Sequence, residues 1–259
     1  MGLAASAASG LMAPVDRTNG KSRMRVLLIA DIHANLAALR ALPSADAILC
    51  AGDVVGFGPD AGAVIDELQR LRVRCVRGDE DDAVAKNVWH PVPPSLEHAG
   101  LEVRERTREA LSQSQMRWLQ NLPPELEESF DGVRIGVTHA YPGDYTRYLK
   151  PTDEEISRIS RAFPHCDIVL LGHTHRSGSW KGRCRIINPG SVGFPQRPGF
   201  AAYAVLEKGK IIFGEARYDP KSTLAMLSTW SISDEAYGEC ANELTEGSTR
   251  PYARVATAR

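Results

Sequence analysis

The sequence predicts an α/β fold in which strands and helices alternate along the chain. Short apolar runs rich in branched residues, typical of buried strands, alternate with segments whose apolar residues recur at helical spacing. In addition, each of the first three apolar runs ends in Asp or His. Ligands bind outside the carboxyl ends of the strands in open α/β sheets, so this pattern also predicts where a functional site lies.

The first three strand units are expected between residues 24 and 81. MRVLLIA (24–30) is a strand, and LAALRAL (36–42) has the spacing of a helix. ADAILCAGDVV (45–55) is a second buried strand with a Gly-bearing exit. PDAGAVIDELQRL (59–71) is a helix with Pro and Asp near its start, and VRCVRGDED (73–81) is a third strand and loop.

Residues from about 82 to 128 are expected to form a helical insertion beside the sheet. HPVPPS (90–95) is a Pro-rich loop, residues 101–122 form one long polar helical stretch, and PPELEES (123–129) breaks it. Four further strand segments and a helix follow, and the last strand segment predicts a hairpin that turns at Lys208-Gly209-Lys210. These segments are VRIGVTHA, DIVLLGHTH, CRIINPGS, AAYAVLEKGKIIFGEARY and PKSTLAMLSTW.

We expect one domain over residues 24–233, because no linker or internal repeat divides it. Residues 1–23 are expected to be a disordered extension, since no Lys or Arg precedes their apolar part as in a secretory signal. Residues 234–259 are polar and are expected to be a flexible tail.

Composition limits the function classes. The chain has 259 residues, and 31 Lys plus Arg against 32 Asp plus Glu give a net charge of −1. This balance argues against bulk electrostatic binding of nucleic acid or of an anionic membrane. Five scattered Cys without a C-x-x-C pair indicate reduced thiols, and no apolar run approaches about 18 residues, the length of a membrane span. A cytoplasmic location is therefore expected.

Seven Asp and His residues end five predicted strands and form a candidate metal site. Asp31 and His33 are two residues apart at a strand end, as are His173 and His175, so each pair can chelate one ion. A single such Asp is usually a turn residue and a single His a loop residue, but those readings would have to hold at every strand end. The seven residues are Asp31, His33, Asp53, Asp79, His139, His173 and His175.

Six motifs follow one another along roughly residues 24–218: DIHANLAAL, GDVVGFGPD, VRGDEDDAV, a mid-chain THA, GHTH and NPGSVGFPQ. In this order they resemble the motifs of the calcineurin-type metallophosphoesterase superfamily. The similarity is greatest to its small bacterial and archaeal phosphodiesterase branch. The resemblance implies a four-layer α/β/β/α sandwich of two mixed sheets flanked by helices. It also implies two divalent metals, with Mn expected and Fe, Zn, Co or Ni also accepted by such donors.

The resemblance assigns roles residue by residue. Asp31, His33 and His175 would hold the first metal, Asp53 would bridge both, and His139 and His173 would hold the second together with Asp79. A metal-bridging hydroxide would attack phosphorus in line. The residues expected to take part in catalysis are Asp53, Asp79, Glu80 and His139, and those expected to help bind substrate are Glu80, Asn188, Ser191 and Arg176.

Two positions depart from the family pattern. Asp79 stands where relatives usually have Asn. Two cations contribute +4 and Asp31, Asp53 and Asp79 contribute −3, so with a hydroxide the site is near neutral, which favours diester monoanions over monoester dianions. Glu80 stands where relatives often have a His that is thought to contact the substrate or protonate the leaving group. Glu80 could replace that His if its pKa is raised, or it could be a solvated loop residue.

Other residues near the motifs keep two readings each. Asp81 and Asn35 could orient the imidazoles, or act as a helix N-cap and a turn residue. Arg side chains could clamp phosphate or be solvated, and the aromatic residues could stack on a nucleobase, pack in loops, or belong to a lid or an oligomer contact. These residues are Arg77, Arg147, Arg176, Arg197, Tyr141, Tyr145, Trp89 and His90.

Two classes of function remain open. The first is a two-metal phosphoesterase, above all a phosphodiesterase, acting on a small phosphoester such as a nucleotide. The alternative activities within this class are those of a phosphomonoesterase, a protein phosphatase or a dinucleotide polyphosphate hydrolase. The second is a scaffold that keeps the fold for protein contacts, as the retromer-subunit type does, although a scaffold is expected to lose metal ligands. A homo-oligomer is left open.

Overall fold

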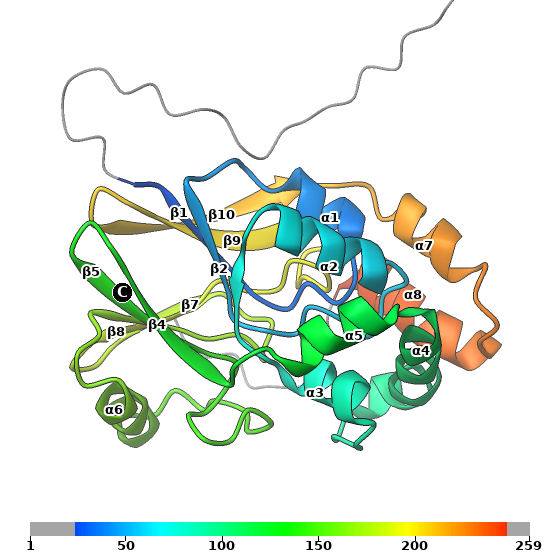
Figure 1. The fold of residues 1–259 in the computed structure, drawn as a ribbon, viewed down its shortest axis with the longest axis horizontal. Coiled ribbons are helices and arrows are strands. Elements are labelled where there is room, and N and C mark those ends of the chain that lie inside the picture. The colour runs from blue at the N-terminus through cyan, green and yellow to red at the C-terminus, as the bar shows by residue number, and fades with distance from the viewer. Residues whose placement is uncertain (1–23, 248–259) are drawn as a thin grey trace, which may run out of the picture.

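The computed structural model describes residues 24–247, which form two five-stranded mixed sheets with helices on their outer faces (Figure 1). In the first sheet, three parallel strands are followed at one edge by the antiparallel hairpin. Its order is β10 (Lys210–Arg217), β9 (Phe200–Glu207), β1 (Val26–Ile29), β2 (Ala47–Cys50) and β3 (Arg74–Cys75). In the second sheet, three parallel strands lie between antiparallel edge strands. Its order is β4 (Glu125–Phe130), β5 (Val133–Thr138), β6 (Ile168–Leu170), β8 (Arg185–Asn188) and β7 (Gly178–Lys181).

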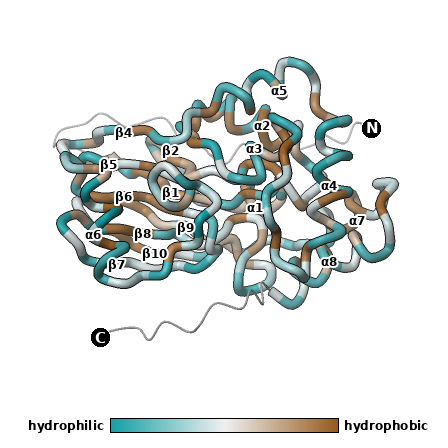
Figure 2. Tube along the Cα trace, turned by 90° about the horizontal axis from the view of Figure 1, so that it is seen from below, coloured by the Kyte–Doolittle hydropathy of each residue, from teal (hydrophilic) through white to brown (hydrophobic). Residues whose placement is uncertain are grey.

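The apolar side chains of β1 alternate between two cores. Val26 and Leu28 belong to the cluster between the two sheets, whereas Leu27 and Ile29 belong to the cluster under the helices. Because both faces of the strand are buried, its sequence is a continuous apolar run rather than an alternating one. Figure 2 shows the strands as largely hydrophobic segments stacked inside the sandwich.

Helices complete the four layers that the sequence predicted. α1 (Leu36–Ala41) and α2 (Ala61–Arg70) supply Leu39, Ile65 and Leu68 to the core on the outer face of the first sheet. α6 (Asp153–Ala162) packs Ile156 and Ile159 against the outer face of the second sheet. The α/β/β/α sandwich is thus confirmed.

The insertion contains several helices rather than one long one. α3 (Asp79–Lys86) and a 3₁₀ turn (Pro94–Leu96) precede α4 (Glu97–Ala110) and α5 (Gln113–Gln120). The predicted helical stretch breaks at Ser112, which caps α5 by accepting from the backbone N–H of Gln115. β4 begins at Glu125, so the insertion ends a few residues earlier than the predicted boundary near 128.

The predicted flexible tail is wrong in its first part. α8 (Asp234–Glu246) is a regular helix that packs Cys240 and Leu244 into a core shared with α4 and α7 (Lys221–Leu227). Ser233 caps this helix by accepting from the N–H of Ala236. The predicted N-terminal extension and the rest of the tail lie outside the described residues.

Candidate metal centre

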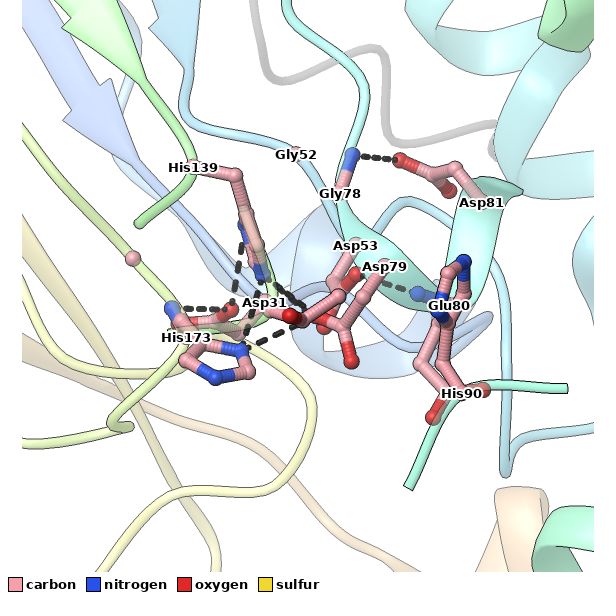
Figure 3. Close-up of polar contacts among 12 residues, drawn as sticks. Asp31, Gly52, Asp53, Gly78, Asp79, Glu80, Asp81, His90, His139 and His173 are labelled. Carbon is pink, nitrogen blue, oxygen red and sulfur yellow. Dashed lines mark hydrogen bonds and ion pairs between the residues drawn. The ribbon is translucent and has the colours of Figure 1, made fainter. Parts of the chain in front are cut away.

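Loops at the carboxyl ends of the strands bring all seven predicted residues to one edge of the sandwich. Each is buried, and none is more than 5% exposed. They form two groups of four, and the ligand atoms within each group lie within 4.8 Å of one another. Figure 3 shows Asp31, Asp53, Asp79, His139 and His173 of this set pointing toward one another. The first group is Asp31, His33, Asp53 and His175, and the second is Asp53, Asp79, His139 and His173.

The backbone of these loops is left-handed at five of the seven positions. Positive φ is uncommon outside glycine, although Asp, Asn and His tolerate it better than most other residues. Such conformations persist only where the surrounding structure enforces them, and they concentrate at functional sites. The φ angles are 56° at Asp31, 46° at His33, 51° at Asp53, 65° at His173 and 57° at His175.

In the first group, the two imidazoles point their Nε2 atoms toward the same place. Nε2 of His33 lies 2.8 Å from Nε2 of His175. Carboxylate oxygens approach the same point, with Asp53 Oδ2 3.7 Å from His33 Nε2 and Asp31 Oδ1 3.9 Å from His175 Nε2.

In the second group, Asp79 lies between two imidazoles. Its Oδ1 is 2.9 Å from His139 Nε2 and 2.9 Å from His173 Nδ1, and these two nitrogens are 3.2 Å apart. Asp53 Oδ2 is 3.4 Å from His139 Nε2, so this carboxylate adjoins both groups.

Backbone carbonyls, rather than acidic side chains, orient two of these imidazoles. His139 Nδ1 lies 2.7 Å from the carbonyl oxygen of Ala51, and His175 Nδ1 lies 3.1 Å from that of Phe194. Donation from Nδ1–H to a carbonyl leaves the Nε2 lone pair directed into the centre, which is the usual arrangement behind a metal-binding imidazole.

The expectation that Asp81 and Asn35 orient imidazoles is wrong, because both make other contacts. Asp81 accepts from the backbone N–H groups of Val54, Val55 and Gly78, so it holds the loop that carries Asp53 and caps α3. Asn35 accepts from the N–H of Ala38 and caps α1. The alternative reading of Asp81 as a capping residue is therefore correct, whereas Asn35, whose alternative reading was a turn residue, is the N-cap of α1.

The acidic groups attract positive charge to the centre. Burial favours a higher pKa for Asp79, but His173 and His139 outweigh it and hold the pKa of that carboxyl well below its ordinary value. Burial favours a lower pKa for His139, but Asp53 and Asp79 raise it well above its ordinary value. Buried carboxylates and imidazoles packed this closely are the donor set of a borderline divalent cation, so the residues fit the predicted metals.

Glycines give the donor-bearing loops the space they need. A Cβ at Gly78 would lie 2.1 Å from Asp53 Oδ1 and 2.4 Å from the Asp53 backbone nitrogen. A Cβ at Gly172 would lie 2.9 Å from Cβ of Ala30 and 3.1 Å from Asp31 Oδ1. The glycine before Asp79 therefore lets two loops approach closely enough for both carboxylates to reach one centre.

Residues 24–210 match the family model of the calcineurin-like phosphoesterase superfamily domain. The chain belongs to this superfamily. Membership and the two donor groups together indicate a metal-dependent phosphoester hydrolase that takes divalent cations. Among the described residues, no helix combines the length and the apolar character needed to cross a membrane.

Three proteins that this chain resembles share most of their length with it. The uncharacterized protein MJ0912 of Methanocaldococcus jannaschii is 26% identical over 227 residues, which covers 76% of this chain and 88% of the relative. A metallophosphoesterase of Sphaerobacter thermophilus is 23% identical with a TM-score of 0.69 and covers 85% of this chain and 99% of its own. The hypothetical protein PH1004 of Pyrococcus horikoshii OT3 is 20% identical, has a TM-score of 0.70 and covers 83% and 96%. At these identities the solved structures support the fold alone.

Glu80 is not a solvated loop residue. It lies in the first turn of α3, is 2% exposed, and forms a two-point ion pair with Arg104 of α4, at 2.8 Å from Nε and 2.6 Å from Nη2. Its backbone N–H donates to Asp53 Oδ1 at 3.0 Å. Burial raises the pKa of Glu80 to about 7 even though Arg104 opposes the rise. Arg104 was not predicted from the sequence, because it lies 24 residues away in the insertion.

The predicted substrate-binding residues Asn188 and Ser191 are committed to the metal-site loops. Asn188 Nδ2 donates to the carbonyl oxygen of Gly172 at 2.6 Å and to Thr174 Oγ1. Ser191 Oγ donates to the carbonyl oxygen of Asp31 and accepts from the N–H of Phe194. Both are buried and hold the loops that carry the donor residues, and their part in substrate binding stays a prediction. Arg176 directly follows His175 and is half-buried.

Several other predicted residues gather around Asp82 instead of the metal groups. Asp82 Oδ2 accepts from Tyr145 Oη at 2.8 Å and lies 3.0 Å from His90 Nε2, while Oδ1 pairs with Arg77 and Lys86. Arg147 stacks on Tyr141, and Arg197 pairs with Glu215 at the surface. These Arg residues therefore have partners within the protein.

Proposed function

We propose that this chain is a phosphodiesterase that uses two divalent cations, with Mn²⁺ as the native metal and a small phosphodiester, such as one containing a nucleoside, as substrate. The observation that carries the proposal is Asp53, whose carboxylate belongs to both donor groups. A carboxylate in this position supports a pair of cations that act together rather than two separate sites.

The donor groups divide the ligands between the two cations. Asp31, His33 and His175 would hold one cation, Asp79, His139 and His173 would hold the other, and Asp53 would contribute to both. Bound divalent cations activate water as a nucleophile and neutralise charge on phosphate oxygens. In the reaction, the water oxygen forms a bond to phosphorus, the bond from phosphorus to the leaving oxygen breaks, and a proton passes to solvent.

Asp79 supports a diester rather than a monoester as the substrate. It adds a third carboxylate to the centre where relatives usually have Asn. This extra negative charge repels a dianionic monoester more strongly than a monoanionic diester. The small cavity beside the centre also offers no further cation, because the described residues that line it include neither Lys nor Arg.

Metal content and hydrolysis test the proposal together. After reconstitution with Mn²⁺, we expect two metal ions per chain by elemental analysis. We also expect faster hydrolysis of methyl p-nitrophenyl phosphate than of p-nitrophenyl phosphate. Asp53→Asn keeps the shape and the acceptor for the Glu80 N–H, and we expect it to retain at most one ion and to lose turnover. Lys208→Gln, in the hairpin turn far from the centre, is the control.

Two results would contradict the proposal. A protein that retains no metal and hydrolyses no phosphoester would be a scaffold that keeps this fold for protein contacts. A protein that retains metal but prefers the monoester would be a phosphomonoesterase or phosphatase. A screen of dinucleotide polyphosphates with the same enzyme distinguishes the remaining hydrolase class.

A further inference from the structure

The segment from Val88 to Pro93 connects α3 to the 3₁₀ turn before α4, and part of it lies over the metal centre. Pro91, Val92 and Pro93 line the same small cavity as His33, Asp53, Asp79 and His173. Tyr148, from the loop after β5, lines this cavity as well, and its ring centroid lies 4.2 Å from that of His173. The segment and Tyr148 therefore supply proline, valine and aromatic groups to the lining, which Phe57 and the Arg104-paired Glu80 complete.

This cavity is too small for a substrate as it stands. Its volume is about 10 Å³, which is room for about one water molecule. A phosphodiester that reaches the donor groups therefore requires part of this lining to move, and it then contacts the lining groups. The groups that the segment presents to the cavity thus become part of the substrate-binding surface.

Side chains outside the cavity hold the segment in place. His90 Nε2 lies 3.0 Å from Asp82, and Arg104 Nη1 donates to the carbonyl oxygen of His90 at 3.1 Å. The Arg104 guanidinium also lies 5.3 Å from the ring centroid of Trp89. Since Arg104 pairs with Glu80 as well, one side chain links the segment to the helix that carries Asp79.

Val92 lines the cavity beside the centre and also rests on α4. A Cβ added at Gly100 of α4 would lie 3.0 Å from both Cγ atoms of Val92, so Val92 rests closely on that glycine. Val88 and Trp89 instead line a separate surface cavity of about 570 Å³ bounded by α4. The segment therefore has an outer part, Val88 and Trp89, at the surface cavity, and an inner part, residues 91–93, at the metal centre.

We propose that Val92, with its neighbouring prolines and Tyr148, is the specificity-determining wall of the site and selects phosphodiesters whose second ester group is uncharged and apolar, such as an aryl group. This rests on the proposed phosphodiesterase function. The wall offers dispersion contacts and removal of apolar surface from water. It offers no counter-charge, because Arg104 is not among the described residues that line the cavity and two of its guanidinium nitrogens pair with Glu80.

Two substrates with one leaving group test the proposal. p-Nitrophenyl phenyl phosphate and methyl p-nitrophenyl phosphate both release p-nitrophenolate and differ only in the second group. We expect kcat/KM of the wild-type, Mn²⁺-loaded protein to favour the phenyl ester by about tenfold or more, because more apolar area is buried. Val92→Thr, which keeps the shape but adds a hydroxyl, and Tyr148→Ala should each reduce this preference by about threefold to tenfold.

Val88→Thr is the matched control, because it makes the same change on the outer part of the segment. We expect the phenyl-to-methyl ratio to stay at the wild-type value. Equal ratios in the wild type, Val92→Thr and Tyr148→Ala proteins would overturn the proposal. So would a loss of preference in Val88→Thr of the same size as in Val92→Thr.

Binding provides a readout that does not depend on turnover. Calorimetric titration of the metal-loaded protein with diphenyl phosphate and with dimethyl phosphate should give a lower Kd for the diphenyl compound, and Val92→Thr should narrow the difference. If neither ester is hydrolysed but this binding preference is present, the proposed phosphodiesterase function is wrong and the proposed role of the wall in selecting apolar ester groups is supported. If both esters are hydrolysed and the variants change neither ratio, the wall fails and the proposed function stands.

Discussion

Asp79 is one of three carboxylates in the donor groups, with Asp31 and Asp53. Its Oδ1 contacts both imidazoles of the second donor group, and an amide oxygen could occupy the same position. The exchange of Asp for Asn changes the net charge of the centre by one unit with almost no change of shape. Its effect is therefore electrostatic and separable from packing.

Asp79→Asn should raise activity on monoesters relative to diesters. The dianion gains more than the monoanion when one negative charge is removed, by on the order of tenfold in the ratio of kcat/KM values at short range in a partly screened site. The measurement uses p-nitrophenyl phosphate and methyl p-nitrophenyl phosphate with matched metal content. A ratio that does not move toward the monoester would show that the extra charge does not set the preference.

Gly78→Ala should damage the metal centre more than the fold. The added Cβ would lie 2.1 Å from Asp53 Oδ1, so the shared carboxylate must move. We expect lower metal content and a loss of about 1–3 kcal/mol in the free energy of unfolding, as for other overpacked positions. Gly238→Ala in α8 is the control, since a Cβ there meets no atom within 4 Å, and it should leave metal content unchanged.

At the scale of elements, the ion pair between Glu80 and Arg104 joins α3 to α4. Both side chains are buried, at 2% and 6% exposure, and two nitrogens of the guanidinium face the carboxylate. Removal of one partner from a buried pair leaves an uncompensated charge, whereas removal of both charges is tolerated much better. The pair is therefore a test of how the insertion is attached to the metal site.

Arg104→Met should lower the free energy of unfolding by about 3–5 kcal/mol, and adding Glu80→Gln to it should recover part of that loss. Urea unfolding of the two single variants and the double variant measures the coupling. Because Arg104 also holds the His90 carbonyl, the double variant should still show a reduced preference for phenyl over methyl diesters. A double variant no more stable than Arg104→Met would mean that the guanidinium acts mainly through other contacts.

Sequence reasoning correctly predicted the location of side chains whose position depends only on where a strand ends. Asp31 directly follows one apolar run and His175 stands a few residues after another, and parallel strands end at a common edge, so their meeting follows from topology. It failed for contacts that depend on how the insertion packs. Nothing in the sequence around Arg104 indicates that it pairs with Glu80, and the amphipathic pattern of α8 is weak enough that its composition suggested a tail.

At the scale of the whole molecule, metal and fold are expected to be linked. Seven buried ionisable side chains meet between two sheets, and cations bound there stabilise only the folded state. At a free metal concentration near 100 times Kd, this linkage contributes about 2.7 kcal/mol. It does not require the protein to unfold when metal is removed, because four apolar clusters support the sandwich independently.

Removal of metal with a chelator should lower Tm by roughly 5–10 °C, from this free energy and the usual unfolding entropy of a domain of this size. Calorimetric scans with excess Mn²⁺ and with EDTA measure the shift, and circular dichroism at 25 °C should show that the chelated protein stays folded. Asp53→Asn should show a smaller shift. Equal Tm values for the wild type with and without metal would show that bound metal does not stabilise the fold.

The left-handed backbone at five donor residues has a consequence for how the centre fills. Folding, rather than the arriving ion, holds these dihedral angles, so the loops have little order left to acquire when a cation binds. The centre should behave as a preorganised binding site. It should select ions by size and coordination, and its loops should keep their conformation when an ion dissociates. Exchange of one metal for another then becomes a matter of supply and dissociation rate, and the same folded chain can pass through several metal compositions in its lifetime.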